Sequence, residues 1–437
     1  MSTKLELSVK TKSKFRRVLH GCIALPALFV CYLLIVDSAH LGFSRFLSML
    51  AIIQARVEPA DQAIKVTPAD PEAHYTRGLS LVNLERLDEA VDELREATRL
   101  RPHHYYEWLD LGVTLDRLGD HSRADAALRT SISLAPAFAQ PHWQLGNMLY
   151  RAERYPEAFQ ELRKGATSNP NLTGELIRLA WVPAKGDVPT FLAMVQPNNK
   201  RSHFEAALFL ATQSKGDDSV GQARAAGEPT NEEEHSFLRE TVRQLLSVQQ
   251  FPAALEIWKL SHPGLAKNVG VGKEQIVNGD FLDPIVRDDP GFGWQLESIP
   301  SGSVMTDTYG PVSGSRSLRI EYAGDNTPLA PLVSQVVLVQ PKTRYSLAFM
   351  AKGENLISGG PPVIAALAMN TSPPRILGES APLSVGTTEW TAYSCEFTTD
   401  DGMTAVFFTI QRHQCSQMPC PIFGRLWLSR FVLTNKG

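Results

Sequence analysis

The chain has 437 residues, of which 43% are hydrophobic and 20% are charged, and its formal net charge is -3. This length suffices for two or three domains, each with an apolar core of its own. The balanced charge gives no sign of nucleic-acid binding, and no acidic tail is present.

The N-terminal segment has the pattern of a single-pass membrane anchor. Residues 18–36 contain no Asp, Glu, Lys or Arg, and this run approaches the ~20 residues that cross a bilayer as a helix. Residues 1–17 are basic, so the positive-inside rule places them in the cytoplasm and the bulk of the chain in the periplasm or another extracytoplasmic space. A cleaved signal peptide is an alternative, but its apolar run would be shorter, roughly 7–15 residues. A buried soluble helix is the third interpretation.

Residues 71–170 repeat three times with a period of 34. The first unit predicts one helix over 71–84, a turn at 85–87 and a second helix over 88–100. Small residues let the two helices approach closely, and a proline ends the second helix. One unit cannot bury its apolar face alone, so the units are expected to stack as an all-α solenoid. Four columns carry the period: Gly78, Gly112 and Gly146; Ala90, Ala124 and Ala158; Leu94, Leu128 and Leu162; Pro102, Pro136 and Pro170.

These units resemble the tetratricopeptide repeat family. We expect residues 37–70 to hold a degenerate half-repeat whose helix ends near Pro68, and residues 171–263 to hold degenerate helical repeats. Within the latter, residues 203–214 and 234–246 favour helices, and residues 216–231 favour a loop because they are rich in Gly, Asp, Ser and Pro. The resemblance rests on Trp108, Leu111, Gly112, Ala124, Leu128 and Pro136 in the second unit, and on Leu145, Gly146, Leu149, Tyr155, Ala158, Leu162 and Pro170 in the third.

The resemblance implies a concave groove lined by the first helix of each unit. Aromatic, amide and arginine side chains there suit a protein segment or an acidic ligand. In the alternative interpretation, Tyr75 and Tyr106 pack against the next unit instead. The predicted groove residues are Tyr75, Asn83, Tyr106, Arg117, Trp143, Asn147, Tyr150 and Arg151.

The character of the sequence changes after a linker at residues 264–273. Within it, Val269-Gly-Val-Gly-Lys273 lacks the Gly and the Ser or Thr that a phosphate-binding loop needs. Residues 274–437 alternate apolar with polar residues in short runs, which predicts a jelly-roll β-sandwich. About eight strands are expected, and seven of them are placed at 317–322, 334–339, 345–351, 363–369, 391–397, 405–410 and 425–433.

Residues 274–435 resemble carbohydrate-binding modules of families 4, 9 and 22. The resemblance implies a sugar site with aromatic platforms, although the same fold also serves as a structural sandwich. Candidate platforms are Trp294, Tyr309, Tyr322 and Trp390, with Trp427 a further one; for each of them a place in the core is the alternative, and Tyr309 is expected to be the most exposed. The motifs are Ile276-Val-Asn-Gly-Asp-Phe281 with Gly293-Trp294, Gly314–Ile320, Gln335–Pro341 with Tyr345–Leu347, Trp390 with Phe397, and Gly424–Leu428.

The family often holds a structural calcium ion. Here Leu282 and Ser429-Arg430 stand where the family has acidic residues, which leaves Asp280 and Asp283 as possible ligands. We therefore expect no cofactor.

Cys415 and Cys420 bracket four residues, and an oxidised loop there fits an extracytoplasmic compartment. A metal pair, or pairing of either cysteine with Cys395, is the alternative. No catalytic motif such as HExxH, GxSxG or CxxC occurs, and adjacent carboxylates such as Asp400-Asp401 point apart. We expect neither an enzyme nor a metal site.

Together these features predict a multidomain chain, α then β. The first hypothesis is a non-enzymatic, membrane-anchored scaffold of the cell envelope that binds a protein partner through the repeats. Its sandwich would bind glycan, in polysaccharide assembly or export. The second is a protein–protein adaptor whose sandwich is only structural. A glycan-active enzyme is the third, and it would need two carboxylates facing each other across a cleft.

Overall fold

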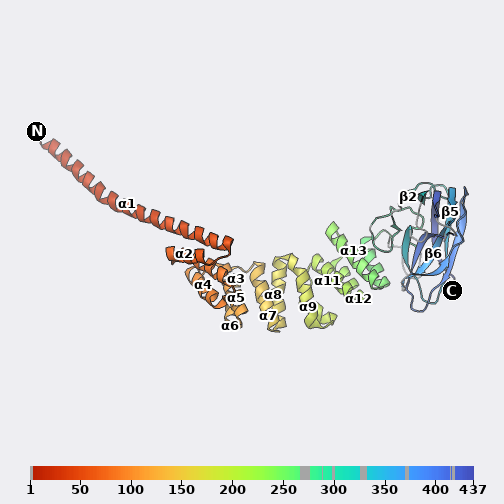
Figure 1. Ribbon diagram of the computed structural model, residues 1–437, viewed down its shortest axis with the longest axis horizontal. Coiled ribbons are helices and arrows are strands. Elements are labelled where there is room, and N and C mark those ends of the chain that lie inside the picture. Colours follow the sequence, from red (N-terminus) through yellow and green to blue (C-terminus); the bar gives the residue numbers. More distant parts are fainter. Residues whose placement is uncertain are drawn as a thin grey trace. The chain divides into compact units, whose positions relative to one another are not determined.

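A computed structural model describes residues 3–265, 276–287, 289–297, 301–324, 332–369, 374–413, 415 and 419–437. For residues 3–27 it describes the helix but not the side chains, and most of the expected linker at 264–273 lies outside the described residues. The chain divides into two compact units, which we call the first unit (residues 1–196) and the second unit (residues 197–437). The first is helical; in the second, helices precede two β-sheets (Figure 1).

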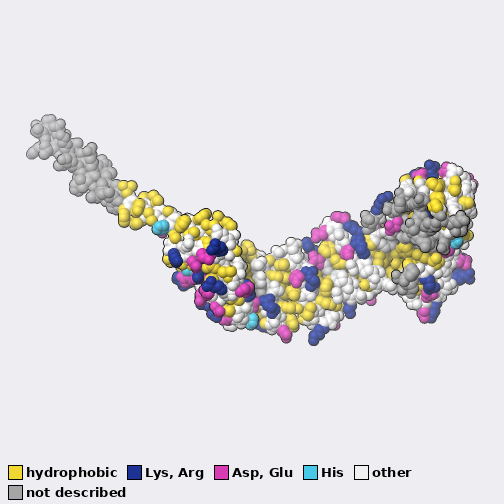
Figure 2. Space-filling view, viewed as in Figure 1, with side chains coloured by type: hydrophobic (Ala, Val, Ile, Leu, Met, Phe, Trp, Pro, Cys, Tyr) yellow, Lys and Arg dark blue, Asp and Glu magenta, His cyan; other side chains and the backbone are white. Residues whose placement is uncertain are grey.

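Helix α1 (Thr3–Gln54) is longer than the predicted membrane segment. A half-repeat was expected from residue 37, but the helix continues to Gln54. Its second half packs against the helices that follow, with Leu47 beside Ala63 and Ala73, and this packing keeps the helix unbroken. Among the described residues, Leu28–Gln54 is long and apolar enough to cross a membrane, by length and composition alone. Figure 2 shows hydrophobic side chains over this part of α1.

The predicted repeat helices are confirmed. Helix α2 (Glu58–Val66) ends just before Pro68, as expected. Three helix pairs follow, and each helix makes its largest contact with the other helix of its pair. The pairs are α3 (Pro71–Asn83) with α4 (Leu87–Leu100), α5 (Tyr105–Leu118) with α6 (His121–Leu134), and α7 (Ala139–Arg151) with α8 (Tyr155–Ser168).

A glycine in the first helix of each pair faces a buried leucine in the second. A Cβ atom added at these glycines would lie 2.6 or 2.7 Å from the leucine Cγ atom, closer than carbon atoms normally approach. The periodic glycine and leucine columns are therefore the two sides of one contact, which sets the spacing of the helices. The contacts are Gly78–Leu94, Gly112–Leu128 and Gly146–Leu162.

The second unit begins with helices of its own, and they include one that the sequence analysis missed. Helix α12 forms where a loop was expected, because Ser219, Val220, Ala223 and Ala226 bury one stripe of it. That packing outweighs the helix-breaking composition. The remaining helices are α9 (Thr173–Ala184) and α10 (Val188–Val195) in the first unit, and α11 (Lys200–Thr212), α12 (Gly216–Ala226), α13 (Glu232–Ser247) and α14 (Phe251–Ser261) in the second.

The β-region consists of two five-stranded antiparallel sheets. Sheet A has the order β1-β4-β9-β6-β7, and sheet B has the order β2-β3-β10-β5-β8. All seven predicted strands form, whereas β1, β2 and β7 were not predicted. The strands are β1 (Gln295–Leu296), β2 (Gly302–Asp307), β3 (Ser317–Gly324), β4 (Val333–Leu338), β5 (Arg344–Ser358), β6 (Pro362–Ala368), β7 (Arg375–Glu379), β8 (Thr391–Thr398), β9 (Ala405–Arg412) and β10 (Ile422–Asn435).

Helices α13 and α14 cover the outer face of sheet A. Along β4, Val337 faces the core between the sheets, while its neighbours Val336 and Leu338 belong to a second cluster that contains Trp258 of α14. Residues 289–292 lie between β4 and α14, and Phe292 packs on Trp258 with ring centroids 6.1 Å apart. Strands β4 and β9 of sheet A are therefore buried on both faces, whereas the edge strand β7 stays exposed.

We predict that Gly112→Ala lowers the free energy of unfolding by about 1–3 kcal/mol, because the added methyl group would overlap the Leu128 side chain. Denaturant unfolding of the full chain measures the change. Gly221→Ala is the control, since its Cβ atom would meet nothing within 4 Å and alanine favours the helix. Equal effects of the two substitutions would contradict the close-contact explanation.

Candidate functional site

The residues predicted to line a groove lie on helices α3, α5 and α7, and we call their shared surface the first-helix face. The structure places them at different depths. Asn83, Arg117 and Arg151 are exposed, while Tyr75, Tyr106, Trp143, Asn147 and Tyr150 are partly buried.

The two tyrosines join the first repeat to the second. Tyr75 donates a 2.6 Å hydrogen bond from its hydroxyl to Asp110, and its ring meets the edge of Tyr106 at 5.2 Å. Burial, and then the bond to Asp110, raises the pKa of Tyr75 above its ordinary value. Tyr75 therefore makes the contact between successive repeats that the alternative interpretation described.

The two arginines of the first-helix face are held by carboxylates of preceding elements. Arg117 bonds both carboxylate oxygens of Glu85 at 2.8 Å, and Arg151 pairs with Asp116. These bridges link successive repeats and neutralise the positive charge that an acidic ligand would need. Within the described residues, the side-chain amides of Asn83 and Asn147 make no hydrogen bond. An amide that is free in this way can pair with the backbone of an extended peptide.

Glu107 is a buried acid that the sequence analysis missed. Its side chain is 0% exposed, and Arg101 approaches it at 3.2 Å, but neither oxygen accepts a hydrogen bond. Burial raises its pKa to about 7, and the charge of Arg101 opposes this only in part. Ala73 and Pro141 stand one period before and after it. A charged residue in an otherwise apolar column was the signal that could have revealed it.

Two of the predicted sugar platforms belong to the core. Trp294 and Tyr322 are only 4% and 3% exposed. Trp294 packs on Phe281 and Phe431 and donates a hydrogen bond to the carbonyl of Asn278 at 3.0 Å. Neither ring can present a face to a ligand, so the prediction for these two residues does not fit their burial.

The other aromatic candidates meet over the outer side of sheet B, in what we call the sheet B cluster: Tyr309, Trp390, Trp427, Lys352 and Asp307. The ring of Tyr309 is 48% exposed and lies 6.2 Å, between centroids, from each tryptophan. The Lys352 ammonium lies 5.3 Å from its centre. Trp427 is buried and donates to Asp307 at 3.0 Å, and it pairs across the strands with Lys352. Tyr309 and the half-buried Trp390 are therefore the accessible rings.

Charged side chains extend the sheet B cluster along neighbouring strands. Arg425 of β10 lies between Glu321 of β3 and Glu354 of β5, at 3.2 and 3.4 Å. Lys352 pairs with Glu389 at 3.1 Å. Aromatic faces with carboxylates and cations around them can stack on sugar rings and bond their hydroxyl groups.

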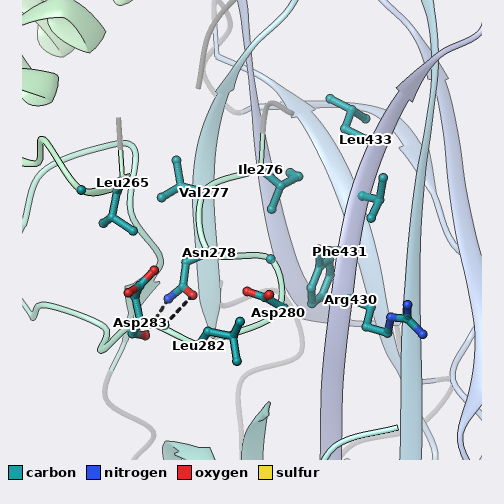
Figure 3. Close-up of a pocket in the computed structure, with 13 residues that line it drawn as sticks. Leu265, Ile276, Val277, Asn278, Asp280, Leu282, Asp283, Arg430, Phe431 and Leu433 are labelled. Atoms are coloured by element: carbon teal, nitrogen blue, oxygen red, sulfur yellow. Dashed lines mark hydrogen bonds between the residues drawn. The ribbon is translucent and has the colours of Figure 1, made fainter. Parts of the chain in front are cut away.

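A polar cavity of about 400 Å³ lies beside the first loop of the sandwich (Figure 3). Asn278 fixes this loop, because its side chain bonds both the backbone N–H and the carbonyl of Asp283, at 3.0 and 2.7 Å. Asp280 and Arg430 also line the cavity. Among the described residues, no three His, Cys, Asp or Glu side chains group so as to hold a metal ion.

A disulfide joins Cys415 and Cys420 in the structure, and Cys395 is a buried free thiol. The guanidinium of Arg412 is buried beside this disulfide and donates to the carbonyl of Cys420 at 2.6 Å and to that of Gly360 at 3.2 Å. These bonds attach the cysteine loop to the turn before β6.

Residues 59–105 and 109–172 match the tetratricopeptide repeat family model. These segments are tetratricopeptide repeats. A tetratricopeptide-repeat-containing protein of Pseudomonas aeruginosa is 38% identical over 108 residues, or 24% of this chain. The chain spans only 43% of the length of that relative.

Solved structures with similar folds include tetratricopeptide and carbohydrate-module proteins. MamA (residues 41 to the end) from Desulfovibrio magneticus RS-1 is 19% identical, over 36% of this chain and 93% of its own, with a TM-score of 0.32. YrrB, described as having an unusual peptide-binding site, is 16% identical over 48% and 90%, with a TM-score of 0.28. A structure described as "CBM4 structure and function" is 16% identical over 37% and 99%, with a TM-score of 0.28.

We predict that Glu107 makes the repeats less stable as the pH rises. Its folded-state pKa of about 7 lies above the ordinary value of 4.5, so folding favours the protonated acid. The free energy of unfolding should therefore fall between about pH 4.5 and pH 7 and stay lower above that range. Glu107→Gln should remove this part of the pH dependence and be the more stable form at pH 8.

Thermal unfolding of the natural chain and of Glu107→Gln, from pH 4 to pH 8, measures the difference between their stabilities. Taking this difference cancels the contributions of the other titrating groups. Glu96→Gln, at a partly exposed site paired with Arg99, is the control. Parallel pH profiles for the natural chain and Glu107→Gln would contradict the prediction.

Proposed function

We propose that this protein is a non-enzymatic scaffold, anchored in the membrane of the cell envelope, that binds a protein partner through its tetratricopeptide repeats. The observation that carries the proposal is the pair of free amides, Asn83 and Asn147, on the first-helix face beside the partly buried Trp143. They offer hydrogen bonds to a peptide backbone and an aromatic surface to its side chains. Because Arg117 and Arg151 are already paired, an extended peptide fits better than a strongly acidic ligand.

The proposed location rests on the two ends of the chain. Residues 28–35 of α1 expose apolar side chains on every side, which is costly in water and favourable in lipid. The basic residues before them support a cytoplasmic N-terminus. The disulfide between Cys415 and Cys420 supports an oxidising, extracytoplasmic compartment for the sandwich.

We propose further that the sheet B cluster binds glycan and that the scaffold serves in polysaccharide assembly or export. The half-exposed ring of Tyr309 beside Trp390 supports this proposal. Glu321 and Glu354 share one cation, Arg425, and carboxylates held in this way suit hydrogen bonding to hydroxyl groups better than acid–base catalysis. In the competing proposal the sandwich is only structural.

For the protein partner, we predict that the double variant Asn83→Ala/Asn147→Ala captures at least about tenfold less partner than the natural chain. A loss of this size is expected for central interface residues. The measurement is quantitative cross-linking and capture from membranes of the cells that make the protein. Asn171→Ala is the matched control, because its exposed amide lies outside the first-helix face. Equal capture by all three chains would contradict the proposal.

For the glycan, we predict that Tyr309→Ala weakens polysaccharide binding by the full chain about tenfold or more, because an exposed stacking ring is lost. A polysaccharide panel with depletion or calorimetry measures it. Ile376→Ala on β7, which is exposed and apolar but remote from the cluster in the strand order, is the control. A folded natural chain that binds no polysaccharide would favour the structural sandwich.

A further inference from the structure

Helix α1 carries an apolar stripe that the repeats leave uncovered. Beyond Val36 the helix becomes two-sided. Ser44, Leu47, Ser48 and Ala51 are buried, with the Ser44 hydroxyl bonded to the carbonyl of Ala63 at 3.2 Å. The exposed apolar residues lie on another side, and we call the eight of them that share one stripe the α1 seam: Leu28, Tyr32, Ile35, Ala39, Gly42, Phe46, Met49 and Ile53.

The spacing of the α1 seam is that of a coiled coil. Its successive members lie four, three, four, three, four, three and four residues apart along residues 28–53. This average of about 3.5 residues is the repeat by which two helices keep contact along a shared seam. All eight residues are exposed, and Leu28 and Ile53 at its ends are 66% and 70% exposed.

We infer that α1 pairs with α1 of a second copy of this chain, in parallel, along the α1 seam. A lipid surface has no preference for a spacing of 3.5 residues, whereas another helix with the same spacing does. Ala39 and Gly42 are small and lie in the middle of the seam, where two backbones can approach closely. In a parallel pair, each seam residue meets its own counterpart.

Charge and area both permit this pairing. The positions that flank a coiled-coil seam are here residues 29, 31, 36, 38, 43, 45, 50 and 52, and Arg45 alone among them is charged. Like charges therefore do not face each other across the pair. The seam is about 39 Å long at 1.5 Å per residue. Two copies would bury on the order of 1,000 Å², which approaches the size of specific interfaces.

The α1 seam shares no residue with either proposed ligand surface. The side of α1 that packs on α2 and α3 is separate from the seam, so a dimer forms without displacing the repeats. Two copies would present two first-helix faces and two sheet B clusters from one anchor, which increases binding to a repetitive polysaccharide through effective concentration. The parallel direction rests on the proposed membrane anchor, whereas the choice of the seam residues does not.

The test is disulfide cross-linking of the full chain in native membranes, with Cys22 and Cys31 first replaced by serine. Met49→Cys and Gly42→Cys are on the seam, and His40→Cys is an exposed control on the same helix but off the seam. We expect both seam variants to form disulfide-linked dimers at least about tenfold faster than the control. Equal rates, or cross-links of the seam cysteines to a different protein, would overturn the proposal.

A second variant keeps the proposal falsifiable if cysteine substitution disturbs the helix. Phe46→Ser/Met49→Ser should shift the chain from dimer to monomer, by light scattering in mild detergent, with an unchanged helical circular dichroism spectrum. A natural chain that is monomeric in this measurement would overturn the pairing. Membrane fractionation of the same samples reports on the anchor separately, since a membrane-bound monomer refutes the pairing alone and a soluble chain refutes the proposed anchor.

Discussion

The second unit depends on the apolar contact between helices α13–α14 and the outer face of sheet A. Nearly every side chain of β4 and β9 is buried, and the outward apolar ones, such as Val336 and Leu338, need a cover to keep them from water. Trp258 supplies much of that cover. Its indole N–H donates to the carboxylate of Asp289 at 2.7 Å, and burial raises the pKa of this carboxyl group. The last helices and the sandwich consequently form one body.

This contact determines which surface of the sandwich is available. Because helices α13 and α14 cover strands β4 and β9, the outer side of these strands offers no platform, and the aromatic residues of sheet B become the accessible ones. Tyr309 and Trp390 are placed there by the loops that follow β2 and precede β8. Successive repeats, by contrast, are joined by ion pairs and by the tyrosine contact between the first repeat and the second. The first-helix face is left with free amides as its recognition groups.

The sequence predicts the elements whose residues recur periodically or alternate between apolar and polar. It does not predict elements and side-chain positions that depend on tertiary packing. The repeats were predictable because Gly112 and Leu128 recur with their columns, and seven strands were predictable from alternation. Helix α12 was missed because its composition resembles a loop and only burial of Val220 and its neighbours stabilises it. Trp294 packs in the core, which was the alternative for each aromatic candidate, because a short aromatic motif does not show which rings the fold covers. The α1 seam needs the observed exposure, since apolar spacing alone does not separate it from the face that packs on the repeats.

The most direct test of this account is hydrogen exchange of the full chain, measured by mass spectrometry through a denaturant series. The account predicts that peptides from α14 and from strands β4 and β9 lose protection at the same denaturant concentration, because each covers the other. It also predicts that Trp258→Ala shifts that concentration downward for all of them together. Retained protection of β4 and β9 after α14 has opened would show that the sandwich is independent of the helices, and would contradict the account.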